Sequence, residues 1–189
     1  MTEQGLQERQ ERFIGELRRE AANLSAAEDH LVRRARQRLA ELRRSVGRPY
    51  PAPAAYELVL RHDPPEAQEH VWLLTAGLFA LHPMKEASGS RSLGGSLAQL
   101  HRVGSTEARL RQLVTVDPER LPHYLRQAVQ LLRSHAIGID YLTLLRDLCV
   151  LNSKNSDVDT HRVRLRWTRD YYRTVHAQTE KSSTKGSAA

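Results

Sequence analysis

The sequence is poor in cysteine, in aromatic residues and in long apolar segments, and each shortage excludes a class of structure. A single cysteine, Cys149, can form neither an intrachain disulfide nor a cysteine-based zinc site. No apolar run approaches the roughly 20 residues of a membrane helix, so we expect a cytoplasmic protein without a membrane partner. Aromatic residues make up only 5% of the 189 residues, and most must serve a core. Nucleic acid would therefore be contacted through phosphates more than through stacked bases.

The chain also lacks the residue patterns of common catalytic sites. It contains no Gly-x-Ser-x-Gly motif and no pair of histidines four residues apart. His62 and Asp63 invite comparison with metal-dependent phosphohydrolases, but Pro64 follows at once and places the pair before a helix rather than within one. Cys149 lies in an apolar segment, which is more typical of a buried residue than of a nucleophile. The sequence thus predicts no enzymatic activity, no cofactor, no metal site and no small-molecule substrate.

Positive charge is in excess and is carried almost wholly by arginine. The chain has 29 Lys and Arg against 22 Asp and Glu, which gives a net charge of +7. Only Lys85, Lys154, Lys181 and Lys185 are lysines. Arginine meets phosphate through two parallel hydrogen bonds, so the balance indicates a polyanionic partner, most often nucleic acid. A GC-rich genome would also explain the ratio of Arg to Lys, but it would not explain the net charge.

Apolar residues recur at helical spacing through most of the chain, and the alternation typical of strands is nearly absent. Residues Ser25–Glu28 have the pattern of a capping box ahead of an apolar stripe over Leu31–Val46. A short helix over residues 92–101 carries Gly94 and Gly95, which indicates close packing or a bend. We predict an all-α fold, a compact helical bundle of about seven to nine helices with no substantial sheet.

The same pattern suggests how the chain is divided. Residues 1–175 are expected to form a single all-helical domain, with two small sub-bundles of about 1–100 and 101–175 as the alternative. The last helix is predicted to end near Val175, and residues 176–189, rich in Ser, Thr, Lys, Gly and Ala, to form a disordered tail.

Arginines gather on single faces of several predicted helices. On the last helix they are spaced four, three and four residues apart, which places them on one stripe: Arg162, Arg166, Arg169 and Arg173. Apolar residues spread over the opposite arc: Val163, Leu165, Trp167, Tyr171 and Tyr172. Such a stripe requires phosphates or acidic side chains against it, unless it is a solvated surface. On the helix after Ser25, the carboxylates of Glu28, Asp29 and Glu41 could pair with its arginines locally.

A set of short motifs over residues 41–172 carries a family resemblance. In order they are ELRRSVGR (41–48), LFALH (78–82), SLGGSL (92–97), EARLRQLV (107–114), LRQAV (125–129), IDY (139–141), LLRDL (144–148), Trp167 and DYY (170–172). In order and spacing they resemble the CasB family, the small subunit of the type I-E CRISPR surveillance complex called Cascade. Gly95 stands where that family often has a basic residue.

The resemblance implies an all-helical, non-catalytic protein without a cofactor. Its partners would be other Cascade subunits, a second copy of itself stacked head to tail, the guide RNA–target DNA hybrid and the displaced DNA strand. It would bind nucleic-acid backbone without sequence specificity and stabilise the R-loop in antiviral defence. The alternative is a helical interaction subunit whose arginine faces dock on acidic partners without touching nucleic acid.

Nucleic-acid contacts are predicted at two levels. The motifs carry over six residues: Arg43, Arg44, Arg109, Arg111, Arg126 and Arg162. Charge and spacing alone add four more: Lys85, Arg91, Arg166 and Arg169. We expect the arginine rows of separate helices to converge into one positive track.

Overall fold

Residues 3–46, 52–84, 92–153 and 157–186 are described by a computed structural model of the chain. They contain nine α-helices and no strand, which confirms the all-α prediction. The helices are α1 (Glu3–Ala22), α2 (Asp29–Ser45), α3 (Pro53–Leu60), α4 (Glu69–Leu81), α5 (Leu93–Ala98), α6 (Thr106–Thr115), α7 (Leu121–Ser134), α8 (Tyr141–Leu151) and α9 (Asp157–Gly186). Two short 3-10 helices, η1 (Asn23–Ser25) and η2 (Glu66–Gln68), precede α2 and α4. Within these ranges, no helix has both the length and the apolar character needed to cross a membrane.

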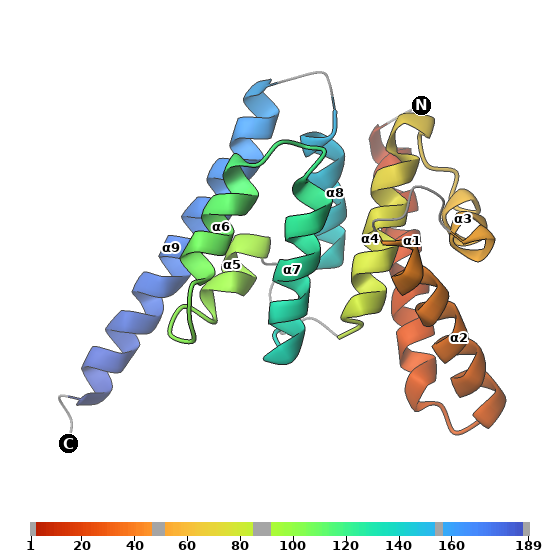
Figure 1. Cartoon of the computed structure of the whole chain (residues 1–189), viewed down its shortest axis with the longest axis horizontal. Coiled ribbons are helices and arrows are strands. Elements are labelled where there is room, and N and C mark those ends of the chain that lie inside the picture. Colours follow the sequence, from red (N-terminus) through yellow and green to blue (C-terminus); the bar gives the residue numbers. More distant parts are fainter. Residues whose placement is uncertain (1–2, 47–51, 85–91, 154–156, 187–189) are drawn as a thin grey trace.

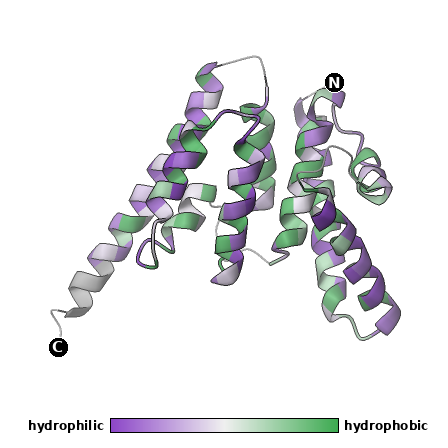
Figure 2. Ribbon diagram, viewed as in Figure 1, coloured by the Kyte–Doolittle hydropathy of each residue, from purple (hydrophilic) through white to green (hydrophobic). Residues whose placement is uncertain are grey.

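The helices lie in two neighbouring groups that meet along α4 and where α1 contacts α8. Helices α1 to α4 form one group and α5 to α9 the other, with α2 and α9 at opposite ends of the molecule (Figure 1). Helix α4 packs against α2 and α3 on one side and against α7 and α8 on the other. Its residues are apolar on all sides, which is typical of a helix buried all round, and Figure 2 shows hydrophobic colours through much of it. The arrangement of the arginine-bearing helices therefore depends on this central helix.

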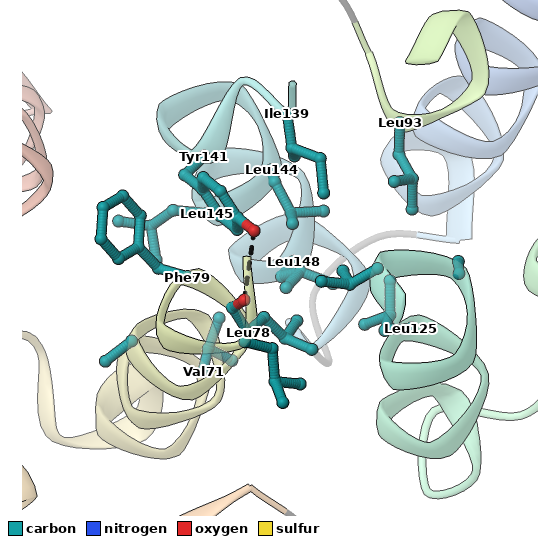
Figure 3. Packing of buried hydrophobic residues seen from close by; sticks show 14 of the residues in the cluster. Val71, Leu78, Phe79, Leu93, Leu125, Ile139, Tyr141, Leu144, Leu145 and Leu148 are labelled. Carbon is teal, nitrogen blue, oxygen red and sulfur yellow. Dashed lines mark hydrogen bonds between the residues drawn. The ribbon is translucent and has the colours of Figure 1, made fainter. Parts of the chain in front are cut away.

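The contact between the two groups includes a well-packed apolar core with a buried tyrosine hydroxyl. Leu78 and Phe79 of α4 face Tyr141 and Leu145 of α8, and Leu125 of α7 closes the cluster (Figure 3). The hydroxyl of Tyr141 donates to the carbonyl oxygen of Leu78 at 3.1 Å, so its polar atom has an acceptor although the residue is buried. Burial raises the pKa of the Tyr141 hydroxyl far above its ordinary value, which keeps it protonated as a donor.

Two glycines mark places where helices approach more closely than a side chain allows. A Cβ built on Gly94 in α5 would lie 1.9 Å from the carbonyl oxygen of Trp167 in α9. A Cβ on Gly77 in α4 would lie 2.1 Å from Cγ2 of Val46, just after α2. The close packing predicted at Gly94 is thus confirmed, and its cause is the approach of α5 to the backbone of α9.

Two predicted helix boundaries are wrong. Ser25 lies in η1, and α2 begins at Asp29 after Glu28, which makes no side-chain capping bond, so no capping box forms. The physical reason is that Leu24 packs against the core and holds residues 23–25 in a turn. Helix α9 continues past Val175 to Gly186, so residues 176–186 are helical and do not belong to a disordered tail. No proline or glycine interrupts the helix before Gly186. The division of the chain into domains stays a prediction.

Candidate nucleic-acid interface

The structure places the predicted contact residues that it describes on four helices spread across the molecule. Among the predicted contacts, Arg43 and Arg44 lie on α2, Arg109 and Arg111 on α6, and Arg126 on α7. The three others that the structure describes lie on α9: Arg162, Arg166 and Arg169. Lys85 and Arg91 lie outside the described residues. Helices α6 and α7 pack together, whereas α2 and α9 stand at opposite ends of the molecule (Figure 1). A track through all of them would have to cross the whole molecule, and its continuity stays a prediction.

The last turn of α2 presents two exposed guanidinium groups. Arg43 and Arg44 are exposed, and no ion pair involves either of them among the described residues. The carboxylate of Glu41, a predicted local partner, instead accepts a hydrogen bond from the amide of Gln37 at 3.1 Å. Cations at a helix C-terminus interact favourably with the helix dipole, so the sequence tolerates this charge without an acidic neighbour.

A different arginine of α2 has a structural role. The guanidinium of Arg38 forms an ion pair with Glu20 of α1 at 2.6 Å, and both side chains are largely shielded from solvent. This ion pair links α2 to α1, and it engages the guanidinium of Arg38 so that it is not available to a ligand. Arg43 and Arg44 therefore differ from Arg38 in having no such described partner.

The two arginines of α6 lie on opposite flanks of their helix. Arg109 is partly buried beside Leu131 of α7, in a small hollow of about 120 Å³. Arg111 is exposed and forms an ion pair with Glu107 at 3.2 Å, and the same carboxylate oxygen accepts a hydrogen bond from the Tyr172 hydroxyl of α9. A separation of two residues turns a side chain by about 200° around a helix, so these two arginines cannot contact one phosphate.

Helix α7 presents Arg126 on its solvent face. His123, Arg126, Gln130 and Arg133 are all exposed and recur at helical spacing, while Leu125 and Val129 point into the core. No ion pair of Arg126 or Arg133 occurs in the described part of the chain. Arg126 and Arg133, seven residues apart, therefore share one exposed face of α7.

On α9 the predicted stripe is partly neutralised by carboxylates of this chain. Arg162 forms an exposed ion pair with Asp159 at 3.0 Å. Arg166 donates to the buried carboxylate of Asp147 in α8, whose other oxygen accepts from the indole N–H of Trp167 at 2.6 Å. Arg166 therefore ties α9 to α8, and this carboxylate partner was not anticipated. Arg169 and Arg173, the other two members of the stripe, are exposed and have no ion pair among the described residues.

Two apolar residues of α9 do not lie where the sequence predicted. Leu165 and Tyr172 were expected on the buried arc, yet both are exposed, while Val163, Trp167 and Tyr171 form the buried seam. The three buried residues recur every four positions in the sequence. That spacing could have distinguished them from Leu165 and Tyr172, which do not follow it.

The residues weighed for catalysis have structural partners. The imidazole of His62 contacts Glu16 of α1 at 2.7 Å, and Asp63 pairs with Arg9 of the same helix. Burial raises the pKa of the Cys149 thiol to about 12, which keeps it protonated and unreactive at neutral pH. Among the described residues, no group of His, Cys, Asp and Glu is placed to hold a metal ion. These contacts favour a structural role for His62, Asp63 and Cys149.

Comparisons of the sequence and of the structure with known proteins point to the same family. The model of the CRISPR-associated protein Cse2 family matches residues 38–172. The structure is similar to CasB from Thermus thermophilus, with 30% identity, a TM-score of 0.65, and coverage of 86% of this chain and 97% of that one. It is also similar to CasB from M. ruber, with 28% identity, a TM-score of 0.67, and coverage of 92% and 98%.

A third similar structure is a chain of a CRISPR RNA-guided surveillance complex, pre-nicking. It shares 26% identity and a TM-score of 0.72, and the match covers 93% of this chain and 98% of that one. No match was found among curated proteins.

Proposed function

This chain belongs to the Cse2 family of CRISPR-associated proteins, and we propose that it is a non-catalytic subunit of an RNA-guided surveillance complex of the Cascade type. Similarity to a chain of such a complex over 98% of that chain's length supports the assignment. The proposed partners are the other subunits, a second copy of this chain, the guide RNA–target DNA hybrid and the displaced DNA strand.

We propose further that this subunit binds the sugar–phosphate backbone without sequence specificity and so stabilises the R-loop. The observation that carries this proposal is the presence of exposed arginines without a described carboxylate partner on α2 and α7: Arg43, Arg44 and Arg126. An unneutralised guanidinium can replace the counterions of a phosphate directly. In such complexes base pairing reads the sequence, so backbone attraction is all that this subunit has to supply.

The carboxylates of the chain rank the eight predicted contacts that the structure describes. Arg111, Arg162 and Arg166 each donate to an acidic side chain already, so a phosphate would have to compete with it. Arg43, Arg44 and Arg126 face no such competition. Arg169 is also unpaired among the described residues, but its helix neighbours Arg162 and Arg166 are neutralised, and Arg109 is partly buried. Phosphate contacts should therefore be strongest at the end of α2 and along α7.

Salt-dependent binding of single-stranded DNA tests the proposal. For the Arg43→Gln/Arg44→Gln double variant and for Arg126→Gln, the affinity should fall and the log–log slope against salt should shrink by about 0.7 for each lost contact. Arg61→Gln is the matched control, because it removes the same charge from an exposed arginine that pairs with Glu16 and Glu57. Oligonucleotides of different sequence should bind equally.

Two results would contradict the proposal. If the α2 and α7 variants bind DNA as the Arg61 variant does, those arginines are not the interface. If the unmodified protein binds with no dependence on salt, phosphate contact is not the mode of binding. In either case the arginine faces would be assigned to acidic protein partners instead.

A further inference from the structure

The outer side of α9 carries a row of exposed apolar side chains at seven-residue spacing. Val158, Leu165 and Tyr172 are 61%, 43% and 41% exposed. These three are distinct from the seam that holds α9 in the fold, where Val163 and Trp167 are no more than 7% exposed. The row therefore contributes little to the packing of this chain, and its apolar surface faces solvent.

The spacing keeps the row on one face of the helix. Side chains seven residues apart drift by only about 20° around a straight helix, so all three lie within a narrow arc. They extend along roughly 21 Å of α9, at about 1.5 Å per residue. Single exposed apolar residues are common on protein surfaces, whereas three that recur every seven residues supply one of the two heptad positions at which paired helices contact each other.

The borders of the row determine which helix would fit. On one side lie Arg169 and Arg173, both exposed and without a described ion pair. On the other side lies α6, where the carboxylate of Glu107 is occupied by the Tyr172 hydroxyl and by Arg111. At the start of the row the carboxylate of Asp159 is likewise occupied by Arg162. The borders beside Leu165 and Tyr172 therefore offer positive charge, whereas the carboxylate of Asp157 lies at the first residue of the helix and that of Asp170 is turned toward the buried seam.

We propose that this face of α9 is the docking site of an acidic amphipathic helix from a partner protein. The apolar residues of that helix would cover Val158, Leu165 and Tyr172, and its Glu or Asp residues would pair with Arg169 and Arg173. Charge complementarity selects this occupant, because a helix with basic flanks would be repelled. The inference does not rest on nucleic-acid binding by the other arginines.

A designed peptide tests the proposal with the full-length protein. The probe is a fluorescent four-heptad helix with leucine at the a and d positions and glutamate at e and g, where like charges suppress its self-association. Anisotropy should show saturable binding to the unmodified protein. Leu165→Ser should weaken it about tenfold, the expected effect of removing one buried leucine. A peptide with lysine in place of glutamate should bind at least about tenfold more weakly.

Leu60→Ser is the matched control, because Leu60 is an exposed leucine of α3 at the other end of the molecule. It should leave peptide binding unchanged. Four results would each overturn the proposal. They are no saturable binding of the acidic peptide, equal binding of the lysine peptide, dissociation of a dimer by Leu165→Ser in light scattering, and a loss of DNA affinity in Leu165→Ser that Leu60→Ser does not share. The last two would assign the row to a second copy and to nucleic acid, respectively.

Discussion

Replacing Gly94 with alanine should destabilise the protein, because the new methyl group has no space against α9. The added Cβ would lie 1.9 Å from the carbonyl oxygen of Trp167, 2.6 Å from its carbonyl carbon and 2.9 Å from its Cα. All three are backbone atoms, which cannot rotate away as a side chain can. Helix α5 would have to retreat by more than about 1 Å from α9 to restore ordinary contact distances.

The magnitude follows from two opposing terms. Overpacking a tight interface costs about 1 to 3 kcal/mol, and the backbone obstacle places this site near the upper end. Alanine regains about 1 kcal/mol over glycine through its helix propensity. The net loss in the free energy of unfolding should therefore be about 2 kcal/mol.

Urea unfolding followed by far-UV circular dichroism measures this loss, and the chain provides a matched control. Gly15 lies inside α1, and a Cβ built on it has nothing within 4 Å. Gly15→Ala should therefore raise the free energy of unfolding by about 0.5 to 1 kcal/mol. If Gly94→Ala proves as stable as the unmodified protein, α5 and α9 do not pack as closely as described and the reasoning is wrong.

Three further predictions concern buried polar groups. Asp147→Ala should lower the free energy of unfolding by about 1 to 3 kcal/mol in the same assay, because a buried indole N–H loses its acceptor; an unchanged midpoint would contradict this. Cys149 should react with a thiol reagent at neutral pH only as fast as the chain unfolds, since burial raises its pKa to about 12, and rapid labelling of the native protein would show otherwise. Burial lowers the pKa of His82 below its ordinary 6.5, so the folded state binds fewer protons and stability should fall as the pH drops through about 6.5. His82→Gln should flatten that dependence.

The sequence was sufficient for the fold because its information is local and periodic. Apolar spacing alone predicts an all-α bundle, and the cost of glycine inside a helix predicts the close approach at Gly94. Boundaries depend on tertiary contacts that the local pattern does not contain. Leu24 packs on the core and keeps Ser25 in a turn, which overrides a good capping-box pattern.

The sequence predicted which arginines could form the candidate site, but it did not predict which of them pair with carboxylates of this chain. Helical spacing places arginines on faces, and Arg43, Arg44 and Arg126 are exposed on the faces of α2 and α7. Whether a guanidinium remains available depends on carboxylates that come from other helices. Asp147 is nineteen residues from Arg166 and on a different helix, so no spacing rule connects them. Leu165 is exposed because the buried seam of α9 follows Val163 and Trp167.

The central position of α4 also determines which part of the protein unfolds last. Its amides are covered from both sides, so they should exchange with deuterium most slowly of all and report the global unfolding free energy. A fragment ending after α4 would expose the side that α7 and α8 normally cover, and it should aggregate rather than remain a dispersed monomer. Trimming of α9 beyond its buried seam should leave that slow exchange unchanged.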